Sequence, residues 1–283
     1  MKPVQQQSRS LTCMLIILPL VLAACSGATT KAAPTPTAVP PATLTASGSG
    51  STTLVLESLA DAYRKQHKDL VFSFPSGSDT GGGVKGALQG QFDLAAMARL
   101  PKDTESAAGL VYLSFGTDKT VVATSSDISL AGLTGQQVKD IFMGKITNWL
   151  AVGGPDATIS VFVREEEETN TQVMRKGLLG DGPFAAGSVG MTSESDLQAA
   201  MSRATKAIGY LTYSGVQLKN LKVHTLAIDG QDPANVSHRY PYTRPLGVGY
   251  LPGNVAKVRP FLDFITGPEG QTLLAKYGLG LAK

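Results

Sequence analysis

The chain has 283 residues, with 25 Lys and Arg residues against 22 Asp and Glu residues, so its formal net charge is only +3. This near balance excludes a strongly basic nucleic-acid-binding protein as the first interpretation, and the length suffices for one large or two ordinary domains. The three His and two Cys residues lack the spacing of a metal site or of a CxxC pair. We therefore expect no metal, no cofactor and no nucleic-acid partner.

The first 25 residues have the features of an exported lipoprotein. A short basic start precedes an apolar stretch from residue 11 to residue 22, which is too short to span a bilayer but typical of a secretory signal. The stretch ends in Leu-Ala-Ala-Cys-Ser-Gly, which resembles the bacterial lipobox, where the signal is cut before the Cys and the Cys is acylated. We predict a signal peptide over residues 1–24 and a lipid on Cys25. An ordinary signal peptide, with Cys25 incidental, is the alternative.

A segment rich in Pro, Thr and Ala follows the predicted lipid site. Residues 25–43 offer almost nothing to pack in a core, and Pro-rich chains are extended. We interpret residues 25–43 as a tether that holds a folded body at the extracytoplasmic face of the cell membrane.

From residue 44 onward, strand-like and helix-like patterns alternate along the chain. Apolar residues at helical spacing predict helices, and short apolar runs predict buried strands. Alternation of this kind is typical of an α/β fold with largely parallel sheets, whose ligand sites lie where strands end and helices begin. The expected helices cover residues 52–67, 84–89, 134–144, 171–179, 196–203, 254–264 and 268–277. The expected strands cover residues 70–74, 92–97, 111–115, 120–123, 159–163, 208–213, 223–227 and 246–250.

Three of the expected helix entrances are candidates for an anion site. They lie at residues 46–53, 76–83 and 164–171, and they are rich in Ser, Thr, Gly or Asn. Backbone N–H groups and hydroxyl groups at the start of a helix can together hold an anion. Each loop alone is equally explained by ordinary capping and turn chemistry, and the chain has no GxxxxGK[ST] phosphate loop.

Signals of an enzyme are scarce in this sequence. There is no GxSxG motif, and no His lies in a context that suggests a Ser–His pair. The four consecutive Glu residues 165–168 could include a general acid and a general base, but without a spacing argument a solvated turn is the simpler interpretation. We expect no enzyme activity and no catalytic residue, with a hydrolase that uses the Glu run as a remote alternative.

Five segments after residue 44 match one family. The most specific are LTGQQVKDIFMGKITNW and FLDFITGPEGQTLLAKYG, and SGSTTLVLESLADAYRKQHKDLVF, GGGVKGALQGQFDLAAMAR and YPYTRPLGVGY agree with them. Together they resemble the periplasmic phosphate-binding proteins of ABC importers. The resemblance implies an α/β, two-lobed type II periplasmic-binding-protein fold, with lobes joined by two crossing strands. Lobe 1 is expected at residues 44–118 and 245–283, and lobe 2 at residues 119–244.

The same resemblance implies a function and a set of ligand-binding residues. The expected function is that of a monomer that captures phosphate, or another small oxyanion, and delivers it to an ABC permease. The family's binding motifs can be placed on this sequence position by position. The residues implied to bind the ligand are Ser51, Thr52, Thr80, Gly81, Gly82, Arg99, Arg164, Thr169 and Asn170.

The chain departs from the family pattern at two positions that matter for an anion. Ala98 stands where the family has a ligand-facing acid, and Glu168 stands where a ligand-binding Ser is expected. A carboxylate about 4 Å from a phosphate oxygen costs about 4 kcal/mol at an effective dielectric of about 20, which is roughly three decades of affinity. Either Glu168 points away, or Arg99 and Arg164 neutralise it, or the ligand is not phosphate. The alternative function is therefore a divergent binding or sensing module of the same fold, without transport.

Overall fold

The computed structural model describes residues 42–68, 70–76, 78–235 and 240–281. The predicted signal peptide, Cys25 and tether residues 25–41 lie outside these residues. The chain divides into two units after Pro40, and the unit from Pro41 onward contains every element described below. Its first strand begins at Ala42, two residues before the expected start of the folded part.

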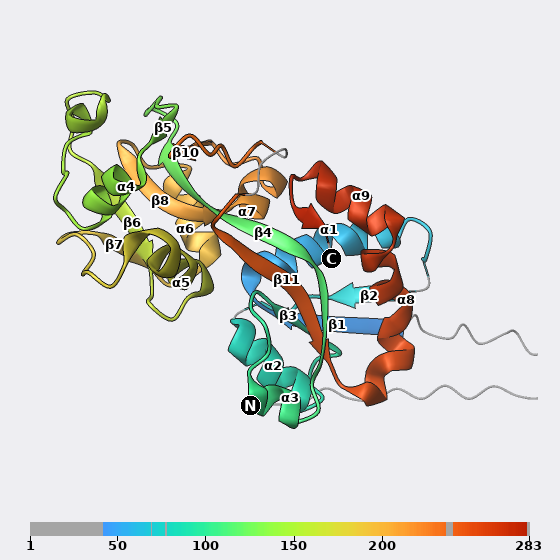
Figure 1. The fold of residues 1–283 in the computed structure, drawn as a ribbon. Coiled ribbons are helices and arrows are strands. Elements are labelled where there is room, and N and C mark those ends of the chain that lie inside the picture. Colours follow the sequence, from blue (N-terminus) through green and yellow to red (C-terminus); the bar gives the residue numbers. More distant parts are fainter. Residues whose placement is uncertain (1–41, 69, 77, 236–239, 282–283) are drawn as a thin grey trace, which may run out of the picture. The chain divides into compact units, whose positions relative to one another are not determined.

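A mixed sheet runs through this unit. Its main strands are β1 (Ala42–Gly48), β2 (Leu70–Ser73), β3 (Leu94–Met97), β4 (Val111–Ser125), β6 (Ser160–Arg164), β7 (Val189–Met191), β8 (Ala207–Thr212) and β11 (Thr243–Tyr250). They are ordered β2-β1-β3-β11-β4-β8-β6-β7 (Figure 1). Two shorter strands, β9 (Val223–Thr225) and β12 (Gly280–Leu281), pair with β4. Strands β5 (Gly132–Leu133) and β10 (Ala227–Ile228) form a separate two-stranded sheet. Strand β1 is parallel to β2 and β3, whereas β11 is antiparallel to β3 and β4.

Helices connect and cover these strands. The α-helices are α1 (Gly50–Tyr63), α2 (Thr80–Leu88), α3 (Asp103–Ala107), α4 (Gly135–Phe142), α5 (Thr169–Met174), α6 (Glu194–Met201), α7 (Tyr213–Leu218), α8 (Val255–Thr266) and α9 (Pro268–Lys276). Three further turns are the 3-10 helices η1 (Trp149–Val152) and η3 (Pro252–Asn254) and the π-helix η2 (Arg175–Leu179). The two short helices α3 and α7 were not predicted, because five or six residues carry too little periodicity to be recognised.

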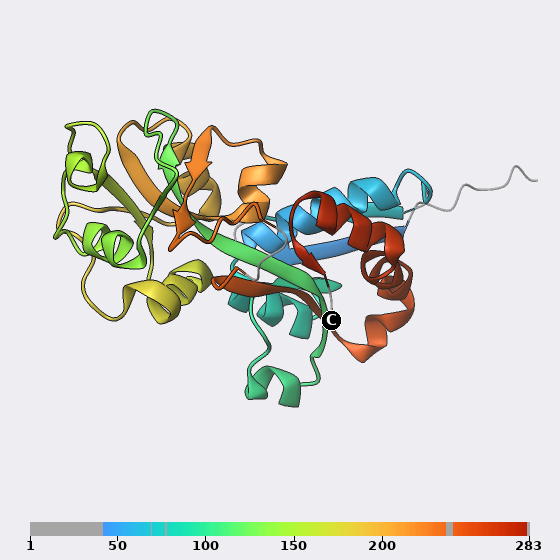
Figure 2. The same ribbon diagram turned by 45° about the horizontal axis from the view of Figure 1, so that its top comes forward.

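Strands β4 and β11 connect two groups of elements, as Figures 1 and 2 show. One core cluster draws all its buried residues from 121–242, around Trp149 and Tyr210. A second cluster combines residues 44–115 with residues 246–279, around Phe115 and Phe261. The long strand β4 takes part in both, since it pairs with β11 up to Lys119 and with β8 from Thr120 onward. The fold is therefore the two-lobed α/β fold with crossing strands that the resemblance implied.

The sequence predicted two strands at residues 111–115 and 120–123, and the structure instead has the single strand β4. The intervening Gly-Thr-Asp-Lys segment is too polar for a buried strand by pattern alone. Its backbone nevertheless pairs with β11, and Asp118 is fully buried because Arg244 and Ser214 supply partners for its carboxylate. A buried charge with a partner thus extends the strand through a segment that looked like a turn.

Helix α2 begins at Thr80, four residues before the predicted start. The carboxylate of Asp79 caps it by accepting a hydrogen bond of 2.7 Å from the backbone N–H of Gly82. Glycine is needed in this first turn because the helix approaches β1 closely. A Cβ on Gly83 would lie 2.5 Å from the carbonyl oxygen of Ser47, so only glycine lets α2 pack at this depth.

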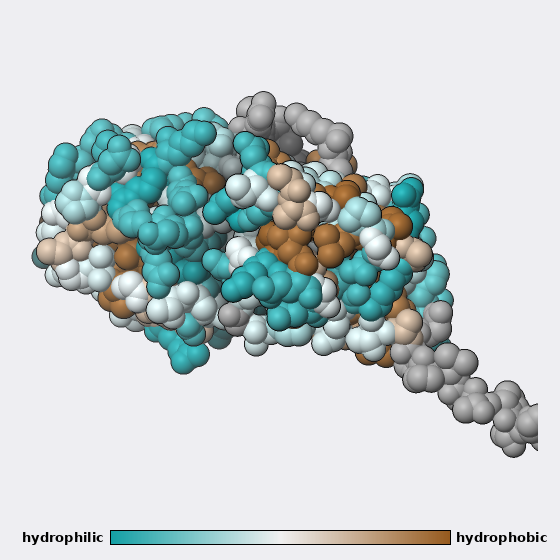
Figure 3. All heavy atoms as spheres, turned by 90° about the horizontal axis from the view of Figure 1, so that it is seen from below, coloured by the Kyte–Doolittle hydropathy of each residue, from teal (hydrophilic) through white to brown (hydrophobic). Residues whose placement is uncertain are grey.

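Most of the face drawn in Figure 3 is polar, with hydrophobic residues in patches in both halves, including one in the half that contains β1 to β3 and α8. Large exposed hydrophobic residues of that half of the fold include Leu100, Val111 and Val255. Within the described residues, no helix combines the length and the apolar character needed to cross a membrane.

Candidate functional site

The first helix entrance places buried hydroxyl groups at the start of α1. Ser51 and Thr52 are 5% and 0% exposed, and the chain reaches them through Gly48, whose φ of +145° excludes most side chains. The Oγ1 atoms of Thr52 and Thr53 make no hydrogen bond within the described residues. A buried hydroxyl without a partner is unfavourable by about 1–3 kcal/mol, which a bound oxyanion would relieve.

The second helix entrance uses most of its polar groups within the chain. The Oγ1 of Thr80 accepts a hydrogen bond of 3.2 Å from the backbone N–H of Ala98, and the N–H of Gly82 is held by Asp79. A Cβ on Gly81 would meet only the Asp79 carboxylate, at 3.4 Å. Thr80, Gly81 and Gly82 are thus brought to the start of α2, where Asp79 already acts as the anion.

Arg99 is engaged by a residue that the sequence analysis did not single out. Its two terminal nitrogens donate to the two carboxylate oxygens of Glu105, at 2.8 and 2.7 Å, and one also donates to the carbonyl of Leu100. The hydrogen bonds to Glu105 raise the pKa of Arg99, and those from Arg99 lower the pKa of Glu105. The structure therefore directs this guanidinium to α3, and its charge is compensated there rather than at Glu168.

The third entrance holds Arg164 at the end of β6. Its backbone N–H donates to the hydroxyl of Tyr210 at 2.9 Å, and burial raises the pKa of that phenol to about 12. The Arg164 side chain is only 10% exposed. One nitrogen donates to the carbonyl of Thr192 at 3.3 Å, and another lies 3.6 Å from a carboxylate oxygen of Glu194. Its Nε and Nη1 atoms make no hydrogen bond within the described residues, so this buried fork retains donors for a ligand.

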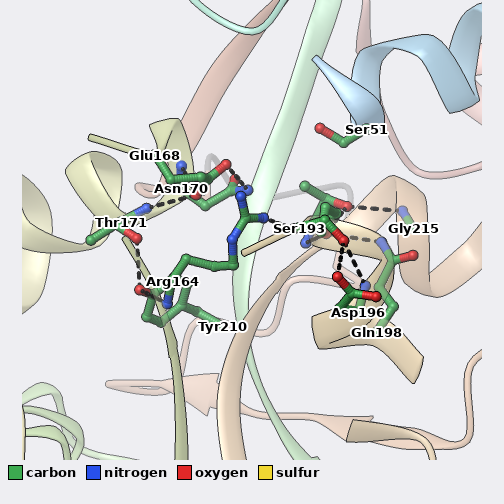
Figure 4. A network of polar contacts seen from close by, with 12 residues as sticks. Ser51, Arg164, Glu168, Asn170, Thr171, Ser193, Asp196, Gln198, Tyr210 and Gly215 are labelled. Atoms are coloured by element: carbon green, nitrogen blue, oxygen red, sulfur yellow. Dashed lines mark hydrogen bonds and ion pairs between the residues drawn. The ribbon is translucent and has the colours of Figure 1, made fainter. Parts of the chain in front are cut away.

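Glu168 turns back onto the start of α5. One carboxylate oxygen accepts hydrogen bonds from the backbone N–H groups of Asn170 and Thr171, at 2.8 and 3.2 Å. The other accepts one of 3.1 Å from the side-chain amide of Asn170 (Figure 4). The Asn170 oxygen accepts from Thr120 at 2.8 Å. Glu168 therefore holds the amide donors of Asn170, which was expected to bind the ligand.

The rest of the Glu run lies at the surface. Glu165 and Glu167 are exposed, and Glu166 accepts a hydrogen bond of 3.0 Å from Arg175, which lowers the pKa of Glu166. Thr169 is half-buried in the first turn of α5. Glu166 and Glu168 thus have different partners, and Glu165 and Glu167 are exposed, so the run does not form the pair of facing carboxyl groups that an acid–base mechanism needs.

Glu194, at the start of α6, is a second buried carboxylate that the sequence analysis missed. One of its oxygens accepts hydrogen bonds from the Thr212 hydroxyl at 2.8 Å and from Gln198 at 2.9 Å. The other makes no hydrogen bond within the described residues and faces Arg164. Figure 4 shows Arg164 between the Glu168–Asn170 pair and the start of α6, beside Ser193.

Arg244, from the segment YPYTRPLGVGY on β11, is the second guanidinium at this place. It is 2% exposed and donates 2.8 Å hydrogen bonds to Asp118 on β4 and to the hydroxyl of Ser51. Asp118 also accepts from the hydroxyl of Ser214, at 2.6 Å. The Nε and Nη1 atoms of Arg244 make no hydrogen bond within the described residues. The signal in the sequence was an Arg-Pro pair inside a segment that resembles the family.

The arrangement thus joins two buried cations with three carboxylates. Arg164 and Arg244 face the carboxylates of Glu168, Glu194 and Asp118. The hydroxyl of Ser51, at the start of α1, joins this cluster through its hydrogen bond from Arg244. Among the described residues, no group of three or more His, Cys, Asp or Glu side chains is arranged to hold a metal ion. The chemistry available is the binding of an anion by guanidinium, hydroxyl and amide donors.

Two lobes on crossing strands, with donors from the first and third helix entrances and from β11 gathered at one place, define a solute-binding protein. The PBP superfamily domain matches residues 33–269, and the chain belongs to that family.

Solved structures and curated relatives agree with this assignment. A protein of Clostridium perfringens, described as a phosphate ABC transporter substrate-binding protein and solved with bound phosphate, is 29% identical. Its TM-score is 0.74, and the match covers 85% of this chain and all of that one. A phosphate transport receptor of Vibrio cholerae shares the fold at 23% identity and a TM-score of 0.61, with 84% of this chain and all of that one covered.

Two curated relatives extend the comparison. The phosphate-binding protein PstS 2 of Streptococcus agalactiae is 33% identical over 102 residues, which span 36% of this chain and 34% of that protein. The phosphate-binding protein PstS of Borreliella burgdorferi is 24% identical over 246 residues, 81% of this chain and 87% of its own length. All of these relatives are described as binding proteins or receptors, in agreement with the expectation that the chain is not an enzyme.

Proposed function

We propose that this protein captures phosphate between its two lobes and delivers it to an ABC permease. The observation that carries the proposal is Arg164, a nine-tenths buried guanidinium with two nitrogens that make no hydrogen bond within the described residues. A guanidinium fork suits the tetrahedral oxygens of phosphate. The buried hydroxyl of Thr52 and the bound phosphate of the Clostridium perfringens relative support the same ligand.

The proposed contacts come from both sides of the crossing strands. We place lobe 1 at residues 44–118 and 245–283 and lobe 2 at residues 119–244, and the change of partner along β4 at residues 119–120 supports this boundary. Ser51 and Thr52 would then bind from lobe 1, and Arg164 and Asn170 from lobe 2. Closure of the lobes on one ligand is the mode of capture that this arrangement supports.

The proposed location is the extracytoplasmic face of the cell membrane, with the protein held as a monomer by a lipid on Cys25. The basic start, the apolar stretch and the Cys that follows it support an anchor of this kind. A diacyl chain gains about 0.8 kcal/mol per buried methylene, so it is enough for durable attachment.

One observation favours the alternative function, a module of the same fold that no longer holds phosphate tightly. Glu168 occupies the amide donors of Asn170 and adds a negative charge beside Arg164. Detection of phosphate that is retained by the purified protein separates the two functions, because a transport receptor with tight binding keeps it through purification.

Titration calorimetry with inorganic phosphate over a range of pH tests the proposal directly. We expect saturable binding that Arg164→Ala abolishes. Arg259→Ala is the matched control, since Arg259 is an exposed cation on α8 that pairs with Asp263. Absence of phosphate binding by the unchanged protein at every pH would overturn the proposed function.

A further inference from the structure

The carboxylate of Glu168 occupies hydrogen-bond donors that a bound oxyanion would use. Its carboxylate accepts hydrogen bonds from two backbone N–H groups and one side-chain amide, which is what an oxyanion would do at the same place. These donors belong to Asn170 and Thr171, and Asn170 is only 1% exposed. An incoming oxyanion cannot use the same N–H groups while Glu168 holds them.

Glu168 and an incoming oxyanion would also compete for the same cation, Arg164. Glu168 shares Arg164 with Glu194, whose second carboxylate oxygen lies 3.6 Å from that guanidinium. Two carboxylates therefore flank one buried cation whose Nε and Nη1 atoms make no hydrogen bond within the described residues. Adding a phosphate anion would bring a third negative group to this place, which is favourable only if one of the three loses its charge.

Resting on the proposed function, we propose that phosphate binding is coupled to the uptake of one proton by Glu168. The carboxylate holds the donors that the oxyanion needs, and it yields them when it becomes a carboxylic acid. The proton comes from solvent and bonds to a carboxylate oxygen of Glu168. The neutral acid then has one O–H donor to offer, which does for a phosphate oxygen what the hydroxyl of a Ser would do.

Every element packed around Glu168 contributes a group to this balance. Burial has the largest effect and, together with Glu194 on α6, favours the neutral form, whereas Arg164 on β6 and Arg244 on β11 favour the charged form. The net result is that the pKa of Glu168 lies above its ordinary value of 4.5. The charges of two further neighbours are compensated by other groups, since Asp118 on β4 pairs with Arg244 and Arg175 on η2 pairs with Glu166. Tyr210 on β8 is a neutral phenol.

The experiment compares wild type with Glu168→Gln, which is neutral at all pH values and holds the N–H groups of α5 less strongly than a carboxylate does. Calorimetry with inorganic phosphate is run between about pH 8 and about pH 5, and each titration is repeated in two buffers of different ionisation enthalpy to count protons. The ionisation of phosphate affects both proteins equally, so the ratio of their dissociation constants reports the effect of the Glu168 charge alone. Glu167→Gln is the matched control, because it removes the same charge from an exposed neighbour.

We expect Glu168→Gln to bind phosphate at least about tenfold more tightly than wild type near pH 8, with the two dissociation constants converging as the pH falls. Wild type should take up close to one more proton per phosphate than Glu168→Gln. Glu167→Gln should bind phosphate with the same affinity and pH dependence as wild type. Glu168→Ser should behave like Glu168→Gln, and agreement between these two variants would show that the result does not come from a folding defect in one of them.

A ratio that stays constant across pH, with phosphate bound by both proteins, would overturn the inference and leave the proposed function intact. The inference is also overturned if Glu167→Gln behaves like Glu168→Gln, because surface charge would then explain the effect. If neither wild type nor any variant binds phosphate at any pH, both the proposed function and this inference are wrong.

Discussion

Arg244 and Asp118 lie on neighbouring strands and are joined by a hydrogen-bonded ion pair of 2.8 Å, with side chains that are 1% and 0% exposed. The same Arg244 nitrogen also reaches Ser51 at the start of α1, and Asp118 also holds Ser214 at the start of α7. A single pair on the crossing strands therefore links the helix entrance of one lobe to a helix of the other. It orients Ser51, one of the proposed phosphate contacts.

Removal of the cation from this pair should destabilise the protein strongly. Arg244→Met leaves Asp118 charged and buried, so we expect the free energy of unfolding to fall by about 3–5 kcal/mol. Arg259→Met, which breaks an exposed pair with Asp263, should lower it by no more than about 0.5 kcal/mol. Urea denaturation of both variants measures the difference. Equal losses would show that the buried pair has no special part in stability.

Restoring the family pattern around Glu168 should improve phosphate binding. The resemblance places Gly, Ser and Gly where this chain has Glu167, Glu168 and Thr169. The triple variant Glu167→Gly, Glu168→Ser, Thr169→Gly removes the competing carboxylate, and we expect at least about tenfold tighter binding at neutral pH, or ~1.4 kcal/mol. Calorimetry checks it. A wild-type dissociation constant below about 1 μM would contradict the electrostatic argument.

Two neighbouring threonines allow a ligand contact to be separated from a structural one. The hydroxyls of Thr52 and Thr53 are both buried without a hydrogen bond within the described residues, so replacement by Val should leave stability unchanged or raise it. Only Thr52→Val should weaken phosphate binding, by about tenfold, because Thr52 alone is a proposed contact. Thermal denaturation and calorimetry on the two variants supply the measurements. Equal weakening by Thr53→Val would count against the assignment.

The stability of the protein should report the charge of Glu168. A carboxyl with a raised pKa stabilises the fold only while it is protonated, so this contribution is full below its ordinary value of 4.5 and is lost as the pH rises through the raised value. Without phosphate, Glu168→Gln should therefore have a higher free energy of unfolding than wild type at neutral pH. The advantage should vanish in acid, and denaturant titrations at both pH values test this. An advantage independent of pH would refute the ionisation.

Attachment to the membrane should depend on Cys25. Replacement by Ser removes the sulfur that would carry the lipid, so we expect Cys25→Ser to be released in soluble form or to remain uncleaved. Cys13→Ser is the matched control, because Cys13 lies within the predicted signal peptide and should leave fractionation unchanged. A processed Cys25→Ser protein that still sediments with membranes would rule out the anchor.

The alternation of apolar runs was enough to predict the fold class, because buried strands and amphipathic helices are set by local spacing. What local spacing cannot reveal is the rescue of a polar residue by a distant partner. Asp118 was hidden in a turn-like segment because its partner Arg244 lies 126 positions later, on β11. For the same reason two predicted strands are one in the structure.

The candidate site was only partly accessible to sequence reasoning. The resemblance led to Arg164 and Asn170, and the structure brings both to one place beside Glu168. Glu is not a preferred capping residue, so nothing in the run of four pointed to Glu168 as the cap of α5. The partner of Arg99 was also out of reach, since Glu105 lies in a helix too short to be predicted.

The way the sheet is threaded also sets an order on folding. The core around Trp149 is complete within residues 121–242, whereas the core around Phe115 needs β11, α8 and α9 from the end of the chain. Strand β11 lies between β3 and β4, so the first-made lobe has a gap in its sheet until the last-made segment arrives. Contacts that span most of the chain form slowly, because a long loop must close first. The residues around Trp149 should therefore gain protection from hydrogen exchange before those around Phe115, and truncation of the chain before β11 should leave β1, β2 and β3 unfolded.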